Sequence, residues 1–149
     1  MEELKWVDSS DGEIPENAVE GGNEGETVLY VGRMSSFGDL IPGKVIAGQG
    51  CYICYGCEEH HFTSDYQILV NDAGVTLEWV AAADGEIPEN SVPGGETASG
   101  ETLYIGRGTH EGELICGKIH QTHNCLYVAH CEGEHAINEY EVLTCKADE

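Results

Sequence analysis

The sequence predicts an all-β protein: two tandem repeats of short antiparallel strands, related by pseudo-twofold symmetry and sharing one core. Residues 38–44 return almost unchanged as residues 112–118, 74 positions later (118 − 44). Short runs of β-branched and aromatic residues bounded by glycine recur in both copies, as is typical of strands. The 20 glycines among 149 residues also divide the chain into pieces that are mostly too short for ordinary helices.

The first elements of each copy are a Trp-Val dipeptide and a turn. Trp6 and Trp79 open the two copies, 73 positions apart (79 − 6), and an identical heptapeptide follows at residues 11–17 and 84–90. Its Asp-Gly and Pro predict a turn used twice, because Gly supplies positive φ and Pro fixes its own φ. Paired glycines come next in both copies, after which one extra residue changes the offset from 73 to 74.

Strands are expected after the paired glycines, at each lysine and in two later runs of each copy. A single copy of this size would be marginally stable alone, so we expect one domain over residues 1–149. Repeat one should cover about 4–72 and repeat two about 77–145, joined by an Asn-Asp-Ala-Gly turn. The expected strands are residues 28–33, 44–46, 51–55 and 66–70 in the first copy and 103–107, 118–120, 125–128 and 140–143 in the second.

The charge of the chain excludes some partners. With 28 acidic and six basic residues the formal net charge is −22, whereas nucleic acids and anionic membrane surfaces attract Lys and Arg. No apolar run approaches the ~20 residues of a membrane span, so we expect no nucleic-acid partner and no membrane insertion. The acidic start, residues 1–3, is unlike a secretory signal. We therefore expect a protein that is cytoplasmic or released without a classical signal peptide.

Four of the six basic residues occupy matched positions of the two copies. Lys44 and Lys118 are 74 apart (118 − 44), and so are Arg33 and Arg107 (107 − 33). In so acidic a chain, each matched cation should meet a specific need. We expect the arginines to be structural, since Arg ties segments together through its five donors, and the lysines to contact a ligand.

The order of these motifs resembles the DM-nine repeat. It runs Trp-Val, Gly-Glu-Ile-Pro-x-Asn-Ala-Val, Gly-Gly, Leu-Tyr-Val-Gly-Arg, Gly-Asp-Leu-Ile-Pro-Gly-Lys and Cys-Tyr-Ile-x-Tyr-Gly, and it covers essentially the whole chain, twice. This repeat occurs in insect and mollusc proteins and in some natterin-like fish toxins. The resemblance implies an all-β tandem-repeat protein, often a homodimer. For the mollusc members it implies a lectin that binds mannose-containing glycans or microbial polysaccharide in innate pattern recognition.

In the mollusc lectins that this chain resembles, sugar recognition relies on the lysine of a Pro-Gly-Lys turn, which Lys44 and Lys118 match. An ammonium donates to sugar hydroxyls that in turn donate to a carboxylate, and charged partners make the stronger hydrogen bonds. Asp39 and Glu113, close to the lysines in sequence, are further candidate carbohydrate-binding residues. The alternative is that the lysines only pair with such acids, in exposed pairs worth ~0–1 kcal/mol. On the ligand interpretation, replacing either lysine by Met should change stability by no more than the ~0.5 kcal/mol usual at surfaces.

The resemblance also implies an acidic residue just after the paired glycines. Counted from the glycines it is Glu24, but counted back from Tyr30 it is Asn23. In the second copy the position falls on Thr97, beside Glu96, so this copy departs from the family pattern.

Cysteine and histidine patterns point to structural roles. The seven cysteines are expected to be reduced and mostly buried. Cys51, Cys54 and Cys57 resemble zinc ligands, but strand residues three apart face opposite sides. We therefore expect no metal and no cofactor. His60 and His135, each preceded by Glu, are expected to hold a backbone carbonyl.

No pattern in the sequence indicates an enzyme: there is no nucleophile elbow, Walker loop or His-Glu-x-x-His. Two hypotheses remain. The leading one is a non-enzymatic lectin for mannose-type glycans with up to one site per repeat. The other is a non-catalytic intracellular interaction or stress-response module, possibly zinc-bearing, that has kept the fold and lost the sugar site.

Overall fold

The computed structural model describes residues 4–146, which form fourteen β-strands and one short 3-10 turn. The all-β prediction is confirmed. The first copy contains β1 (Lys5–Ser9), β2 (Glu20–Glu24), β3 (Thr27–Ser36), β4 (Asp39–Ile46), β5 (Gly50–Tyr55), β6 (Glu58–Phe62) and β7 (Tyr66–Val70). The second contains β8 (Leu77–Ala83), β9 (Pro93–Glu96), β10 (Thr102–His110), β11 (Glu113–His120), the 3-10 turn η1 (Gln121–His123), β12 (Cys125–His130), β13 (Gly133–Ile137) and β14 (Glu139–Cys145).

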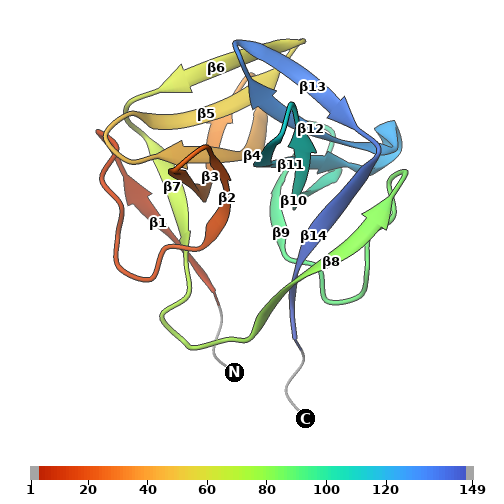
Figure 1. The fold of residues 1–149 in the computed structure, drawn as a ribbon, viewed down its shortest axis with the longest axis horizontal. Helices are drawn as coiled ribbons and strands as arrows, with labels where there is room; N and C mark the ends of the chain where they lie inside the picture. The colour runs from red at the N-terminus through yellow and green to blue at the C-terminus, as the bar shows by residue number, and fades with distance from the viewer. Residues whose placement is uncertain (1–3, 147–149) are drawn as a thin grey trace.

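The two sets of seven strands repeat one pairing scheme. In the first set β1 pairs with β7, β7 with β3, β3 with both β2 and β4, and β4, β5 and β6 follow as a meander. The second set repeats every one of these antiparallel pairs, from β8–β14 to β12–β13. In Figure 1 the red-to-yellow strands occupy one side and the green-to-blue strands the other. The expected pseudo-twofold arrangement is therefore present.

The copies are joined by strands that cross between them. β2 pairs with β11, β9 pairs with β4, and β6 meets β13. The second glycine of each pair permits the crossing, since a Cβ on Gly22 would lie 2.1 Å from the Leu114 carbonyl oxygen and one on Gly95 2.0 Å from that of Leu40. The paired glycines thus mark where the backbone of one copy meets that of the other.

The principal hydrophobic core draws on both copies, as the repeat pattern predicts. A second cluster belongs to the first copy alone and lies between β4, β5 and β7. Each fully buried aliphatic side chain contributes ~1.5–3 kcal/mol, so the shared cluster couples the folding of the copies. The shared cluster includes Leu29, Val31, Leu69, Ile105, Ile115, Leu126, Val142 and Leu143; the second consists of Ile41, Val45, Cys51, Ile53, Tyr66 and Ile68.

The identical heptapeptides form the predicted turns, and each is fastened to the last strand of its copy. The backbone N–H of Gly12 donates to the Tyr66 hydroxyl at 2.8 Å, and that of Gly85 donates to the Tyr140 hydroxyl at the same distance. Both tyrosines are buried. The repeated turn is therefore a packing contact of the fold.

The Pro-Gly-Lys segment and its counterpart Cys116-Gly117-Lys118 differ from their prediction. They were expected as turns followed by strands from 44 and 118, but they lie inside β4 and β11, which begin at Asp39 and Glu113. The glycine of each segment explains the difference, because it lets the next strand approach closely: a Cβ on Gly43 would lie 2.2 Å from the Tyr52 carbonyl oxygen. Six further strands, β1, β2, β6, β8, β9 and β13, were not predicted, since pairing rather than local propensity makes them strands.

The arginines have the structural role expected of them. Each guanidinium lies over the tryptophan that opens its copy, 4.0 Å from the ring centroid of Trp6 for Arg33 and 4.3 Å from that of Trp79 for Arg107. Each Nε donates to a side chain on the last strand of its copy, at 2.8 and 2.7 Å. Arg33 also reaches the carbonyl of Gly94 in the other copy at 3.2 Å. Both arginines lie within β3 and β10, inside the strands expected at residues 28–33 and 103–107.

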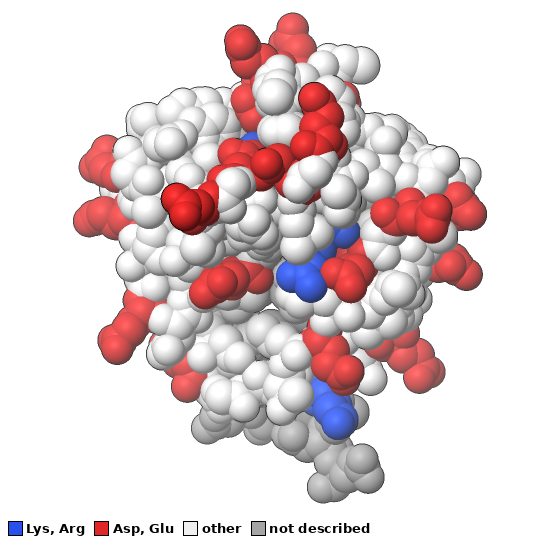
Figure 2. Space-filling view, viewed as in Figure 1, with Lys and Arg blue, Asp and Glu red and all other residues white. Residues whose placement is uncertain are grey.

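The acidic residues cover the surface while most of the basic ones turn inward. Figure 2 shows Asp and Glu spread over one face, with Lys and Arg visible at few points. Across residues 4–146 the structure contains no helix with the length and apolarity needed to span a membrane. The acidic start at residues 1–3 lies outside the described residues.

Candidate functional site

Lys44 and Lys118 lie at the junction of the two copies and are almost fully buried. Their side chains are 3% and 6% exposed, so the expectation of surface lysines is wrong. The reason is their position in β4 and β11, from which each ammonium reaches into the opposite copy. Lys44 Nζ donates to the Ala129 carbonyl at 2.6 Å, and Lys118 Nζ donates to the Cys54 carbonyl at 2.8 Å.

The surroundings of Lys44, the Lys44 site, are closed by carboxylates. Its ammonium donates to the Glu24 carboxylate, and Glu59 Oε2 lies 3.6 Å away. With the Ala129 carbonyl, these acceptors surround an ammonium that has three donors. Buried charges require this kind of pairing. The Lys44 site is therefore satisfied within the protein.

The surroundings of Lys118 are more open. The nearest carboxylate oxygen is Glu134 Oε2, at 3.5 Å. The ammonium lies 5.6 and 5.5 Å from the ring centroids of Tyr55 and Tyr127, one from each copy. Thr97 stands where the first copy has Glu24 (97 − 24 = 73), so within the described residues Lys118 pairs with one carboxylate where Lys44 pairs with two.

A cleft of about 710 Å³ opens in front of Lys118, and we name it the Lys118 cleft. Its volume lies within the ~300–1,000 Å³ of small-molecule sites. The wall is mainly polar and aromatic, with contributions from both copies. The lining residues are Asp39, Tyr55, Gly56, Cys57, Thr97, Ala98, Ser99, Glu101, Lys118, His120, Thr122, His123, Tyr127 and Glu134.

One wall of the Lys118 cleft is an ordered network of acid, hydroxyl and imidazole. Glu101 accepts from the Thr122 N–H at 3.0 Å and from its hydroxyl at 2.8 Å, and its carboxylate lies 3.2 Å from His120 Nδ1. Although desolvation opposes the change, these Thr122 hydrogen bonds lower the pKa of Glu101. Burial, reinforced by His123, lowers the pKa of His120. At neutral pH the wall therefore presents an anionic Glu101 and a neutral His120.

The tyrosine beside Lys118 also stays protonated over the physiological range. Burial, together with the neighbouring Cys125 thiol, raises the pKa of Tyr127 to about 12. Its hydroxyl lies 2.9 Å from His123 Nδ1. The Tyr127 ring and hydroxyl therefore form an uncharged part of the wall of the Lys118 cleft.

The residues that the sequence offered as alternatives after the paired glycines make different contacts. Glu24 reaches Lys44, whereas Asn23 donates from Nδ2 to the Gly25 carbonyl at 3.0 Å. In the second copy Thr97 lines the Lys118 cleft, and Glu96 is exposed on β9.

The acids at the start of β4 and β11 hold the loop of the opposite copy. Asp39 Oδ1 accepts from the Ala98 N–H at 2.8 Å, and Glu113 accepts from the Gly25 N–H. Neither acid forms an ion pair with the lysines within the described residues. Asp39 also lines the Lys118 cleft.

The sequence interpretation missed Glu59 and Glu134 as partners of the lysines. Each precedes a histidine that holds a backbone carbonyl, as expected: His60 Nε2 lies 3.0 Å from the Tyr55 oxygen and His135 Nε2 2.8 Å from the His130 oxygen. The repeated Glu-His pair was therefore the feature of the sequence that could have identified Glu59 and Glu134 as partners of the lysines.

The cysteines are free thiols, and most are buried, as predicted: Cys51, Cys54, Cys116 and Cys125 are buried, Cys145 is intermediate, and Cys57 and Cys131 are exposed. Burial raises the pKa of Cys51 and Cys54 strongly, and that of Cys116 to about 12. Within residues 4–146, the cluster of side chains able to hold a metal ion is His110, Glu111 and His130, and it includes no cysteine.

These features define a pseudo-symmetric, all-β tandem-repeat protein with a buried lysine from each copy at the junction. Residues 23–137 match the DM9 repeat, and the chain belongs to this family. It is 34% identical to Natterin-4 of Thalassophryne nattereri over 153 aligned positions, which cover 97% of this chain and 35% of that protein. It is 33% identical to Natterin-3 of the same organism over 139 positions, 92% of this chain and 35% of the relative. The chain thus spans about a third of the length of these relatives.

The fold is also similar to a solved structure of low sequence identity. The crystal structure of the nematode sperm cell motility protein MFP2B superposes with a TM-score of 0.73 at 15% identity, over 97% of this chain and 47% of that one. At this identity the similarity concerns the fold alone.

Proposed function

We propose that this protein is a non-catalytic lectin for mannose-type glycans and that the Lys118 cleft is its principal ligand site. The observation that carries the proposal is an almost fully buried ammonium, bonded to one carbonyl, at a cleft large enough for a sugar. Lys118 has three donors, so it keeps N–H capacity for a ligand oxygen.

The groups around Lys118 suit adjacent hydroxyls of a pyranose. One hydroxyl accepts from the ammonium, while its neighbour donates to Glu134 or Thr97. Hydrogen bonds to charged partners are the stronger ones. The Tyr55 and Tyr127 rings, which flank the ammonium, offer apolar surface to the C–H face of the sugar. Discrimination between sugars then follows from the orientation of the two hydroxyls.

We further propose recognition of mannose-bearing microbial polysaccharide by a homodimer, in the manner that the family resemblance implies. Linking two or more weak sites raises avidity by as much as ~10²–10⁴ where the geometry permits. Mannan should therefore compete much better than free mannose at equal concentration of mannose units. Light scattering tests the dimer independently of the sugar.

The decisive experiment compares Lys118→Met with Lys5→Met. The Lys5 side chain is 60% exposed, so its variant controls for loss of one positive charge. Losing charge-assisted hydrogen bonds costs about 1.5–3 kcal/mol of binding free energy, about ten- to a hundredfold in affinity. We expect that loss of mannan affinity, measured by calorimetry, in Lys118→Met and near wild-type affinity in Lys5→Met.

Two results would contradict the proposal. One is unchanged mannan binding by a folded Lys118→Met variant, which would place the sugar elsewhere. The other is a silent glycan array for the wild-type protein, which would favour the interaction-module hypothesis.

A further inference from the structure

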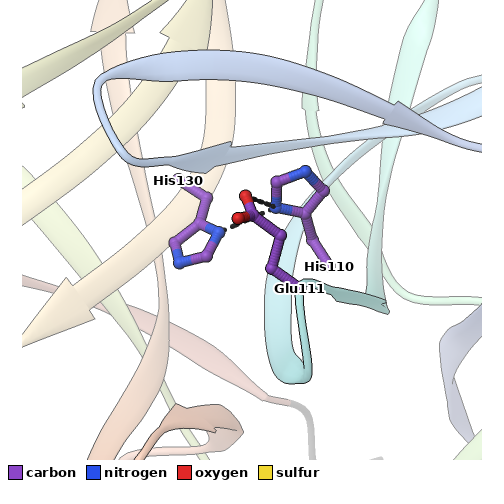
Figure 3. Close-up of side chains that lie close together, drawn as sticks. All are labelled: His110, Glu111 and His130. Carbon is purple, nitrogen blue, oxygen red and sulfur yellow. Dashed lines mark hydrogen bonds and ion pairs between the residues drawn. The ribbon is translucent and has the colours of Figure 1, made fainter.

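Three chemistry-bearing side chains of the second copy, which do not line the Lys118 cleft, meet at the ends of two strands. His110 ends β10, Glu111 follows in the turn, and His130 ends β12. Figure 3 shows the two imidazoles facing each other with the Glu111 carboxylate directed between them. Of the three, Glu111 lies outermost, with 66% of its side chain exposed against 21% for His110.

The ligating atoms already converge. His110 Nδ1 lies 2.8 Å from His130 Nδ1, and Glu111 Oε2 lies 3.5 Å from His110 Nδ1. All three ligating atoms lie within 4.8 Å of one another. Two facing imidazole nitrogens share one proton at most, so the pair leaves a position that a cation can fill.

We propose that His110, His130 and Glu111 form a binding site for one divalent transition-metal ion of the Zn²⁺ class. Zn²⁺ binds imidazole nitrogen at ~2.0–2.1 Å and carboxylate oxygen at ~2.0–2.2 Å, in tetrahedral geometry. Two nitrogens at those distances stand roughly 3.3 Å apart, which requires the histidine rings to separate by about half an ångström. The exposed carboxylate leaves the fourth position to solvent.

The donor set selects the class of metal. Imidazole suits zinc, copper and nickel, whereas calcium and magnesium take oxygen ligands. A site with two nitrogens is therefore distinct from the many exposed carboxylates of this chain, which favour the hard cations. The ion binds in place of the proton shared between the two rings, so binding releases that proton to solvent.

His135 acts as a positioning residue for this metal site. Its ring stacks on His110 with centroids 3.9 Å apart, and its Nε2 lies 2.8 Å from the His130 carbonyl oxygen. One side chain thus restrains the ring of the first histidine and the backbone of the second. Such partners of metal ligands typically affect metal affinity ten- to a hundredfold.

The first copy has the same backbone but a different cluster. Phe37 occupies the position of Glu111 (111 − 37 = 74) and Tyr55 that of His130 (130 − 55 = 75). Their rings stack with centroids 4.6 Å apart, and Phe37 also contacts His60, the counterpart of His135. The fold does not require imidazoles at these strand ends, because aromatic packing fills that space in the other copy. The site is thus confined to the second copy.

The test is Zn²⁺ titration by calorimetry in millimolar Mg²⁺, which occupies oxygen-only sites. We expect one tight Zn²⁺ per chain. His110→Asn and His130→Asn should each weaken binding by more than the ~100-fold upper range for losing a partner of a ligand. Glu111→Gln, at an exposed turn, leaves the fold intact and should weaken binding at least tenfold. His61→Asn, an exposed histidine on β6, is the matched control and should bind as the wild type does.

Substitution of Zn²⁺ by Co²⁺ identifies the ligands. Cys131 is exposed beside His130, and Cys57 is exposed as well. Histidine and carboxylate ligation gives d–d bands without a sulfur-to-cobalt charge-transfer band, and a Cys57→Ser, Cys131→Ser variant should keep the spectrum. Wild-type affinity in Glu111→Gln, or a sulfur charge-transfer band that disappears with the two cysteines, would overturn the proposal.

Discussion

The Lys44 site and the Lys118 cleft share one backbone plan and differ in how the ammonium is satisfied. Each lysine donates to a carbonyl of the other copy and lies near the glutamate that precedes a carbonyl-binding histidine. The first also holds Glu24, whereas the second has Thr97 and an open cleft. One difference in residue type therefore separates an ammonium enclosed by protein acceptors from one that faces a ligand-sized space.

The comparison shows that the two lysines share one structural role and differ in the hydrogen-bond donors that remain for other partners. The carbonyl contacts are mutual: the lysine of each copy fixes a strand of the other, so both lysines contribute to the junction. The additional carboxylate at Lys44, that of Glu24, strengthens this structural role. The omission of one at Lys118 leaves donor capacity that the fold itself does not use.

The largest expected difference between the two sites is in stability. Lys44→Met removes the cation from Glu24 and Glu59, which are only 24% and 13% exposed. Breaking a buried pair costs ~3–5 kcal/mol, and the partial exposure places this variant near ~3 kcal/mol. Lys118→Met strands one carboxylate, and we expect a loss of ~1.5–2 kcal/mol, at the lower end of the range for a hydrogen bond to a charged group.

Urea unfolding at fixed protein concentration measures both losses. Both expected losses exceed the stability change of ~0.5 kcal/mol predicted from the sequence for surface lysines, because the two lysines are buried. Equal losses in the two variants would show that Glu24 adds nothing to the Lys44 site.

A second prediction exchanges the residues that distinguish the two sites. Thr97→Glu should engage Lys118 as Glu24 engages Lys44, and should lower mannan affinity about tenfold, ~1.4 kcal/mol. Glu24→Thr should free a donor of Lys44 and lower stability by ~1–2 kcal/mol. In the Glu24→Thr background, mannan binding should become less sensitive to Lys118→Met.

Calorimetry with mannan, alongside urea unfolding, follows both variants of the exchange. If Thr97→Glu binds mannan as tightly as the wild type does, the openness of the Lys118 cleft is not what admits the sugar.

Much of the fold could be predicted from the sequence because the duplication makes it visible. The repeated turn and the strands rich in β-branched residues, such as β5 and β7, were recognisable from local chemistry. Polar or glycine-rich strands such as β2 and β6 were not, because their residues have low strand propensity and become strands by pairing with the neighbouring β3 and β5.

The site was predictable in its residue types but not in its burial. The matched lysines stood out in so acidic a chain, yet nothing local indicated that a Lys after Pro-Gly lies inside a strand at a junction. Glu134 was missed because it reaches Lys118 only once β11, β12 and β13 are assembled. The His110, Glu111 and His130 cluster was missed for the same reason, since its members come from two separate strand ends.

The smallest expected effect concerns pH and the residue His120, which stands where the first copy has Ile46 (120 − 46 = 74). Burial, reinforced by His123 and Lys118, lowers the pKa of His120, while the Glu101 carboxylate opposes the shift. A lowered folded-state pKa means that the folded protein favours the neutral imidazole. The stability associated with it is present above the unfolded pKa of about 6.5 and is lost as pH falls through the lowered value.

His120→Ile, which copies the first repeat, removes this titration, so its free energy of unfolding should fall less between about pH 7 and pH 5 than that of the wild type. Burial also lowers the pKa of His110, so part of the pH dependence should remain in the variant. Urea unfolding of both proteins at the two pH values measures the difference. An equal fall in the free energy of unfolding of the two proteins would show that the titration of His120 does not contribute to the pH dependence of stability.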